Sequence, residues 1–401
     1  MMWKAMVAEA TARHGVSFVL GAAAALTVVM LVQYQAPAAG LSRARLPGHF
    51  SCSRSLDHHR LNGTAVHTLH KAPTVGAEDH HVHQANATLK ANSTTTDRPA
   101  ALSPLPRTDR QEESTQEPEE FRGLAAAVAL AAMDDRNVII TCVNQAWAAP
   151  GSLLDLFLES FHIGDGTARL LPHVLVVAMD PAAHARCQAV HRHCYHYTMP
   201  GVHMNFTSAK FFGSKEWLEM VWSKLRLQRR VLELGYGFLF TDVDILWFRD
   251  PFKHVTAYAD MTVSSDGYFG DPDNLGNFPN TGLFHVKPNV RTIAMTKVWH
   301  ESRGRYPGAP NEQPVFNMIK KRLVAELGVR LRYLDPAYVG GFCSYGKDLG
   351  KIVTMHANCC VGLKNKMRDL RGVLDDWKNY TKMPHWEKHK ANWTVPGACI
   401  K

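Results

Sequence analysis

The stretch 235–252, GYGFLFTDVDILWFRDPF, places two carboxylates between runs of large apolar residues. The first run predicts a strand that is buried on both faces, as in a parallel sheet. Asp242 and Asp244 follow it, at the end of the sheet where ligands of open α/β folds bind. Carboxylates there are costly unless their charge is compensated, and hard oxygen ligands suit Mg²⁺ or Mn²⁺ beside a substrate phosphate. The pattern therefore predicts a divalent-metal site. The alternative is that the two carboxylates cap a turn at the end of the strand, with Arg249 or Lys253 as their partner.

Segments with strand character and segments with helix character alternate from residue 121 onward. Such alternation predicts an α/β domain with a mostly parallel sheet and flanking helices on both faces. About 280 residues suffice for one domain of this kind with its own core. We predict helices at 121–135, 152–162, 181–191, 215–234 and 311–325, and further strands at 137–144, 173–179, 194–197, 261–265, 282–286, 331–334 and 352–355.

The amino-terminal part of the chain contains an apolar segment, residues 15–34, with no Asp, Glu, Lys or Arg between Arg13 and Arg43. A bilayer-spanning helix needs about 20 such residues. A signal peptide cleaved within 36–39 (APAA) is the alternative, but the length favours an uncleaved transmembrane signal-anchor with residues 1–14 as a cytosolic tail. Flanking basic residues leave the orientation almost tied. Six sequons beyond the segment indicate a lumenal body, at Asn62, Asn86, Asn92, Asn205, Asn379 and Asn392.

Residues 35–120 are rich in Pro, Ser, Thr, Ala, His and Asn and contain few bulky apolar side chains. This composition cannot bury a core, so we predict a disordered, flexible lumenal stem. Its histidines fit no fixed coordination geometry. The acidic run 112–120 marks the end of the stem, and residues 121–401 form the globular domain.

Overall composition is that of an ordinary globular protein, with 46% hydrophobic and 20% charged residues and a net charge of +9. Eight cysteines without a CxxC pair argue against a small disulfide scaffold and against a structural zinc site. The basic run 224–230 is expected to be a solvated helix face. In a lumen it would meet no nucleic acid.

Three further polar groups stand at the ends of predicted elements. Asn280 and Gly282 precede an apolar strand, Glu312 and Gln313 open a helix near its positive end, and His356 ends a short strand. Each has an ordinary structural explanation by itself: a turn, a capping charge or a structural histidine. Their joint occurrence with the Asp-x-Asp pair favours an active site.

Four stretches together resemble the plant nucleotide-diphospho-sugar transferase domain of glycosyltransferase family 77, over roughly residues 121–380. The resemblance implies a GT-A fold, a UDP-sugar donor, Mn²⁺ (or Mg²⁺) and a retaining outcome. It also implies a single-pass type II protein of the Golgi membrane. Such families transfer xylosyl, arabinosyl or galactosyl groups to cell-wall polysaccharide or to hydroxyproline-rich glycoprotein. The stretches are FLFTDVDILWFRDPF (238–252), NTGLFHVKPN (280–289), EQPVFN (312–317) and MHANCCVGLKNKMRDLRGVLDDWKNY (355–380).

The resemblance assigns a role to each metal and nucleotide residue. Asp242 and Asp244 would hold the metal ion against the donor diphosphate, where the ion neutralises charge that develops on the leaving UDP. Asp244 would coordinate directly, Asp242 would also reach the ribose, and His356 would be a third ligand. Thr141 and Asn144, near the end of the first strand, lie where uridine would bind.

The sugar-binding and catalytic residues follow from the same resemblance. Asn280 and Gly282 resemble the segment that borders the donor sugar. Glu312 and Gln313 resemble an acidic–Gln pair near the anomeric centre, where retaining enzymes of this fold often have Asp-Gln, so Glu312 is a departure. No nucleophile can be assigned, and same-face attack with the leaving phosphate as base is compatible with retention.

Cysteines in an oxidising lumen are expected to pair. Cys187 with Cys194 would close a short loop, and Cys343 would pair with Cys359 or Cys360. The partner of Cys399 is left open, since pairing cannot be deduced from sequence alone.

Two other functions are compatible with an apolar strand that leads into Asp-x-Asp. A phosphatase of the haloacid dehalogenase type uses the first Asp as nucleophile, but its motif requires Thr or Val where this chain has Leu246, and it usually opens the domain. A non-catalytic lumenal scaffold with a degenerate donor site would bind UDP without turnover.

Overall fold

The computed structural model describes residues 117–199, 208 and 213–400. All of them belong to one compact unit, residues 103–401. No helix within this part of the chain is both long and apolar enough to cross a bilayer. The predicted cytosolic tail (1–14), anchor (15–34) and nearly all of the predicted stem lie outside the described residues.

The central sheet has seven strands in the order β3-β2-β1-β4-β7-β6-β8. Of the seven described strands, β7 alone runs antiparallel to its neighbours. The prediction of a mostly parallel sheet is therefore confirmed. In chain order the strands are β1 (Asn137–Val143), β2 (Val174–Ala178), β3 (Cys194–His196), β4 (Gly237–Thr241), β6 (Met261–Gly267), β7 (Phe278–Val286) and β8 (Leu331–Tyr333).

Helices cover both faces of this sheet, and all five predicted helices are present with ends that differ by a few residues. Helices α3, α7 and α9 were not predicted. The helices are α2 (Leu124–Ala131), α3 (Gln145–Ala148), α4 (Leu153–Ile163), α5 (Pro181–Val190), α6 (Lys215–Glu233), α7 (Val290–Glu301), α8 (Glu312–Leu327) and α9 (Leu363–Lys382), with 3₁₀ turns at Glu119–Phe121, Ala168–His173, Pro251–His254 and His385–Lys390.

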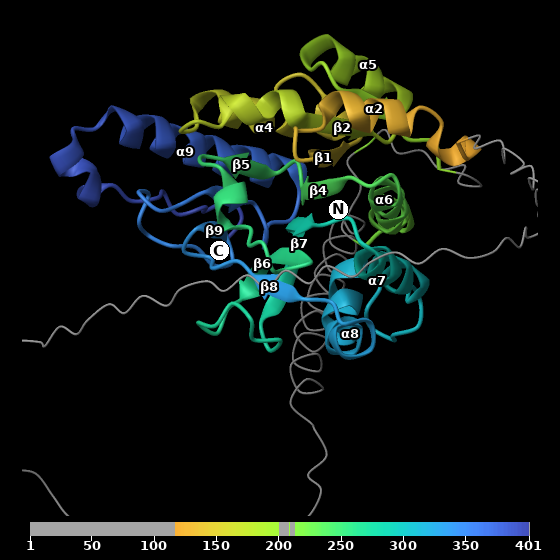
Figure 1. Ribbon diagram of the computed structural model, residues 1–401. Helices are drawn as coiled ribbons and strands as arrows, with labels where there is room; N and C mark the ends of the chain where they lie inside the picture. Colours follow the sequence, from red (N-terminus) through yellow and green to blue (C-terminus); the bar gives the residue numbers. More distant parts are fainter. Residues whose placement is uncertain (1–116, 200–207, 209–212, 401) are drawn as a thin grey trace, which may run out of the picture. The chain divides into compact units, whose positions relative to one another are not determined.

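Successive residues of the central strands point to opposite faces and build two cores. Ile139, Val176 and Leu239 pack in the core that contains α4, α5 and α9. Ile140 and Phe240 pack in the core that contains α2, α6, α7 and α8. Figure 1 shows α6, α7 and α8 grouped side by side against the sheet. The strand that leads into Asp-x-Asp is thus buried on both faces, as its sequence predicts.

A second sheet of three short strands continues from the Asp-x-Asp turn. It contains β5 (Ile245–Trp247), β10 (Thr354–His356) and β9 (Val339–Gly341), in the order β5-β10-β9. Strand β10 is antiparallel to β5, and the pairing sets His356 opposite Ile245. This pairing brings the carboxy-terminal part of the domain to the Asp-x-Asp pair.

Candidate active site

Asp242 and Asp244 occupy the turn between β4 and β5, at the carboxyl end of a central strand. The backbone of the turn is fixed on both sides. Asp242 N donates to Gly282 O at 2.6 Å, and Ile245 N donates to Asp242 O at 3.2 Å. The sheet therefore positions both carboxylates where the sequence predicts them.

His356 completes a cluster with these two carboxylates. Its Nε2 lies 3.4 Å from Asp244 Oδ1 and 3.9 Å from Asp242 Oδ2. One ligand atom from each of the three residues lies within 4.8 Å of the other two. Two carboxylates and an imidazole are a donor set that fits a divalent cation such as Mn²⁺. The structure brings together all three residues that were predicted as metal ligands.

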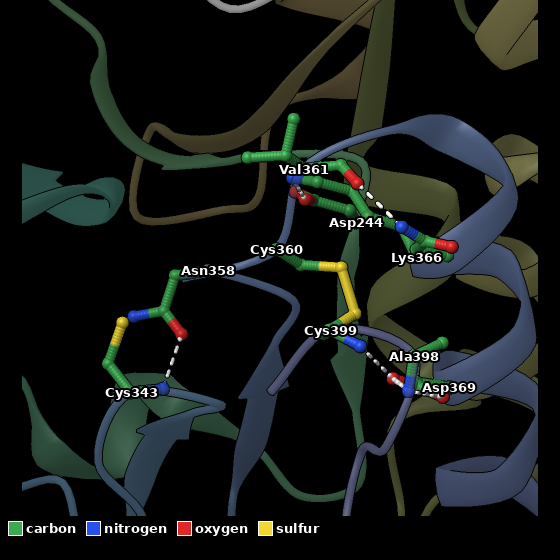
Figure 2. The surroundings of a disulfide bond; sticks show 10 residues. Asp244, Cys343, Asn358, Cys360, Val361, Lys366, Asp369, Ala398 and Cys399 are labelled. Atoms are coloured by element: carbon green, nitrogen blue, oxygen red, sulfur yellow. Dashed lines mark hydrogen bonds and ion pairs between the residues drawn. A yellow bond between two sulfur atoms is a disulfide. The ribbon is translucent and has the colours of Figure 1, made fainter. Parts of the chain in front are cut away.

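Lys366 of α9 enters the same cluster and was not predicted. Its Nζ lies 2.5 Å from Asp244 Oδ2. Figure 2 shows the two side chains next to each other. Burial alone would raise the pKa of Asp244, but Lys366 and His356 hold it well below its usual value, so this carboxylate is ionised. Desolvation raises the pKa of Asp242, which Lys224 partly offsets and the charge of Asp244 reinforces. The two carboxylates of the pair therefore differ in how readily they release a proton.

The prediction that residues 224–230 form a solvated basic helix face is wrong for Lys224. Its side chain is buried at 7% exposure and forms a 2.8 Å ion pair with Glu312. Burial by itself would lower the pKa of Lys224, but the carboxylates of Glu312 and Asp242 raise it to about 12. Gln228, one turn further along α6, is fully buried as well. The amphipathic pattern of α6 turns these polar positions toward the protein and leaves Arg226 and Arg229 partly exposed.

Asn280 and Gly282 lie in β7 beside the metal-ligand cluster. Asn280 Oδ1 accepts from Gly282 N at 2.9 Å. A Cβ atom at Gly282 would lie 2.4 Å from His356 Cε1 and 2.9 Å from Asp242 Oδ2. The absence of a side chain at Gly282 is therefore what lets His356 and Asp242 approach each other.

Glu312 and Gln313 begin α8, whose N-cap Asn311 accepts from Gln313 N at 3.1 Å. Glu312 is buried, pairs with Lys224, and keeps its Oε2 without a hydrogen-bond partner in the described part of the chain. Gln313 Oε1 accepts from Thr281 N at 3.0 Å. Both residues lie against the segment that borders the cluster, and their catalytic role remains a prediction.

Thr141 and Asn144 are less accessible to a bound uridine than the sequence predicted. Thr141 lies within β1, fully buried, and its Oγ1 has no hydrogen-bond partner among the described residues. Asn144 is the N-cap of α3: its Oδ1 accepts from Trp147 N at 3.0 Å, and its Nδ2 donates to Ser208 O at 3.0 Å. Since the side chain of Asn144 is already engaged at both ends, its predicted contact with uridine remains a prediction.

Two adjacent disulfides hold the loop between β10 and α9. Cys343 pairs with Cys359, one of the two predicted alternatives, and Cys360 pairs with Cys399. Figure 2 shows the second bond beside Asp369, whose carboxylate accepts from Cys399 N at 2.8 Å. The predicted Cys187–Cys194 bond is also confirmed. The loop that carries His356 at one end is thus tied to the carboxy-terminal segment.

Asp266 and Asn358 are polar residues of the site that the sequence reasoning did not single out. Asn358 Nδ2 and Asn280 Nδ2 each donate to Asp266 Oδ1 at 2.8 Å. Asp266 stands near the end of the strand MTVSSDG (261–267), so the signal that identified Asp-x-Asp, an acidic residue after an apolar strand, could have identified it too.

The chain is similar in sequence to one protein family and to several plant proteins. Residues 169–370 match the model of the family described as nucleotide-diphospho-sugar transferase. An uncharacterized Arabidopsis thaliana protein is 40% identical over 291 residues, which cover 72% of this chain and 76% of the relative.

Two weaker similarities belong to proteins with a stated activity. A UDP-D-xylose:L-fucose alpha-1,3-D-xylosyltransferase of Arabidopsis thaliana is 24% identical over 40% of this chain and 50% of its own length. The crystal structure of a glycosyltransferase involved in the glycosylation of the major capsid of PBCV-1 superposes with a TM-score of 0.37 at 11% identity. This superposition covers 59% of this chain and 98% of the other.

Proposed function

The chain belongs to the nucleotide-diphospho-sugar transferase family, and from this premise we propose that it transfers a sugar from a UDP-sugar to a glycan acceptor. The observation that carries the proposal is the cluster of Asp242, Asp244 and His356 at the carboxyl end of β4. When bound there, a divalent cation, Mn²⁺ or Mg²⁺, would neutralise charge that develops on the departing diphosphate.

Two lysines supply positive charge on opposite sides of the Asp-x-Asp pair. Lys366 pairs with Asp244 from α9, and Lys224 influences Asp242 from α6. A diphosphate bound at the cluster would give the Lys366 ammonium a second anionic partner beside Asp244. Lys224 remains paired with Glu312, and its positive charge offsets the negative charges of Glu312 and Asp242.

We propose a retaining outcome by same-face attack. Among the carboxylates near Gln313, Glu312 is buried in an ion pair with Lys224, and Asp266 accepts hydrogen bonds from neighbouring amides. Glu312 is thus held by its ion pair and buried, and Asp266 is engaged by its hydrogen bonds. A mechanism in which the leaving phosphate acts as the base needs no protein nucleophile and suits this arrangement.

The proposed donor is a UDP-pentose or UDP-galactose, and the proposed acceptor is a cell-wall polysaccharide or a hydroxyproline-rich glycoprotein. Similarity to a plant xylosyltransferase that uses UDP-D-xylose supports the pentose. We also propose a single-pass type II location in the Golgi membrane, anchored by residues 15–34. Three disulfides in the described part of the chain support an oxidising compartment.

Hydrolysis of UDP-sugars tests this proposal. The full-length chain, produced in a host with an oxidising secretory pathway, is assayed with UDP-xylose, UDP-galactose, UDP-arabinofuranose and UDP-glucose in Mn²⁺ and in EDTA. The proposal predicts Mn²⁺-dependent release of UDP from one donor, lost in Asp244→Ala. UDP binding without turnover on any donor or acceptor would instead favour the non-catalytic scaffold. Membership of the family argues against the phosphatase, which predicts phosphate release from simple esters.

A further inference from the structure

Asp266 accepts hydrogen bonds from three amide side chains that come from three different parts of the fold. Asn280 Nδ2 from β7 and Asn358 Nδ2 from the loop after β10 both donate to its Oδ1 at 2.8 Å. Gln313 Nε2 from the start of α8 donates to its Oδ2 at 3.0 Å. Asp266 is thus the point at which β6, β7, α8 and the loop after β10 are joined.

Each of these amides also accepts a hydrogen bond from a backbone N–H through its oxygen. Asn280 Oδ1 accepts from Gly282 N at 2.9 Å, and Gln313 Oε1 accepts from Thr281 N at 3.0 Å. Asn358 Oδ1 accepts from Cys343 N at 3.1 Å. A backbone N–H can only donate and an ionised carboxylate can only accept. If any of the three amide groups rotated by a half turn, its NH₂ would face the backbone N–H and its oxygen would face the Asp266 carboxylate. The hydrogen bonds therefore hold each amide in one orientation.

The position of Asp266 follows from an irregularity in the β6–β7 ladder. Ser265 pairs with Pro279 and Gly267 pairs with Phe278, which leaves Asp266 without a partner in the ladder. Bulges of this kind re-aim a side chain and are frequent next to active sites. Here the bulge directs the Asp266 carboxylate to the amides instead of leaving it in the regular alternation of the strand.

We propose that Asp266 is a positioning residue that fixes the amides of Asn280 and Gln313 for the donor sugar. Each amide donates one N–H to Asp266 and has a second N–H, which can donate to an oxygen of the sugar. The inference rests on the proposed function, because it assigns the amides to the sugar of the donor. It predicts that a substitution of Asp266 lowers kcat for the UDP-sugar but leaves the affinity for UDP unchanged.

Asp266→Asn is the informative substitution, because it keeps the size of the side chain and replaces one acceptor oxygen by a donor NH₂. The new NH₂ can replace either Oδ1, which accepts two hydrogen bonds, or Oδ2, which accepts one from Gln313 Nε2. Replacing Oδ2 loses fewer hydrogen bonds, and the NH₂ then faces Gln313 Nε2, so that two donors meet. Gln313 can escape only by turning its own NH₂ toward Thr281 N, which is also a donor. The amide of Gln313 then has no satisfied orientation, while Asp242, Asp244 and His356 keep their places.

Gln313→Glu in the Asp266→Asn background is the matched rescue. The carboxylate at position 313 would accept from the new NH₂ with one oxygen and from Thr281 N with the other, and the net charge of the pair would be restored. Gln313→Glu alone would set two carboxylates against each other at a site where the atoms now lie 3.0 Å apart. Asp134→Asn, in the exposed turn before β1, is the control for loss of one negative charge.

The experiment measures three quantities on the full-length wild type and on these variants: the UDP affinity in Mn²⁺ by calorimetry, kcat for UDP-sugar hydrolysis, and the unfolding temperature. We expect Asp266→Asn to keep the UDP affinity and to lose about 10²-fold in kcat, a loss that a displacement of about 1 Å in the bound substrate can cause. Its unfolding temperature should fall by ~3 °C or more and recover in the double variant. Asp134→Asn should match the wild type in all three measurements.

Several results would overturn the inference. Turnover by Asp266→Asn at the wild-type rate would show that the amides need no fixed orientation. Loss of UDP affinity in proportion to turnover would indicate a merely structural residue. A double variant no more stable than Asp266→Asn, including the case in which both fail to fold, would refute the hydrogen-bond pattern. A wild type that neither binds UDP nor hydrolyses any donor would instead overturn the proposed function, which the unfolding measurements do not depend on.

Discussion

Lys224 on α6 and Glu312 at the start of α8 form an ion pair of 2.8 Å in which the two side chains keep only 7% and 5% exposure. The Lys224 ammonium lies 4.6 Å from the centre of the Phe240 ring, in the strand that leads to the Asp-x-Asp turn. Glu312 Oε1 is also 3.4 Å from Thr281 Oγ1. One buried pair therefore links α6 and α8 to β4, which leads to the Asp-x-Asp turn, and to β7, which carries Asn280 and Gly282.

Lys224→Met should destabilise the protein by about 3 kcal/mol, because it leaves the Glu312 carboxylate buried without its cation. Urea unfolding measures the change. The matched control is Lys224→Met combined with Glu312→Gln, which removes both charges and should recover most of the loss. A single variant as stable as the wild type would show that Glu312 reaches water.

Asp260 should confer pH-dependent stability far from the metal-ligand cluster. Burial alone would raise the pKa of Asp260, but hydrogen bonds from Arg291 and Arg330 hold it well below its usual value. A lowered carboxyl pKa contributes stability at neutral pH that is lost as the pH falls below about 4. Asp260→Asn should therefore cost about 2 kcal/mol at pH 7 and about 1 kcal/mol near pH 3.

Urea unfolding at these two pH values, with Asp134→Asn as the control, measures the effect of Asp260. A loss of equal size at both pH values would contradict the assignment, because it would mean that the pairing does not depend on the charge of Asp260.

Gly282→Ala should abolish metal-dependent activity while the protein still folds. The added methyl would lie 2.4 Å from His356 Cε1 and 2.9 Å from Asp242 Oδ2, so the ligand side chains must separate. Mn²⁺ titration followed by calorimetry should show weaker binding. Gly372→Ala is the control, because nothing lies within 4 Å of the added atom in α9, and alanine there should stabilise by up to about 1 kcal/mol. Normal Mn²⁺ binding by Gly282→Ala would contradict the proposed geometry.

The three disulfides should differ in how much they stabilise the fold. Cys360–Cys399 closes a separation of 39 residues and Cys187–Cys194 one of 7. Chain entropy predicts a stabilisation about 1.5 kcal/mol larger for the longer loop. Paired Cys→Ser variants at 360 and 399, and at 187 and 194, compared by urea unfolding under oxidising conditions, measure the difference. A larger loss at the short loop would show that the contacts of the C-terminal segment, including Asp369, contribute little.

Features that depend on local order along the chain could be predicted from the sequence. The strand before Asp242 is a continuous apolar run with an acidic turn after it, and both its burial and its position follow from that pattern. His356 was predicted as a ligand because it ends a strand. The pairing of β10 with β5 that places His356 beside Asp244 joins segments far apart in the sequence, so it could not be predicted from local order.

Features that depend on which face of an element is covered could not be predicted. Lys224 belongs to a run of basic residues, and charge alone favours solvent, so its burial against Glu312 is apparent only once α8 is packed on α6. Lys366 was missed for the same reason, since its partner Asp244 is far away in sequence. Asp266 could have been noticed as an acidic residue after an apolar strand, but its three amide partners could not. The pairing of Cys360 with Cys399 depends on where the C-terminal segment folds back.

The central claim is that Asp242, Asp244 and His356 bind a divalent cation together with the diphosphate of a nucleotide. Calorimetric titration of UDP into the full-length protein, in Mn²⁺ and in EDTA, tests it most directly, with Asp244→Asn and Asp134→Asn in parallel. The account predicts binding that requires Mn²⁺, is lost in Asp244→Asn, and is unchanged in Asp134→Asn. Equal UDP affinity with and without Mn²⁺, or retained Mn²⁺-dependent binding by Asp244→Asn, would contradict it.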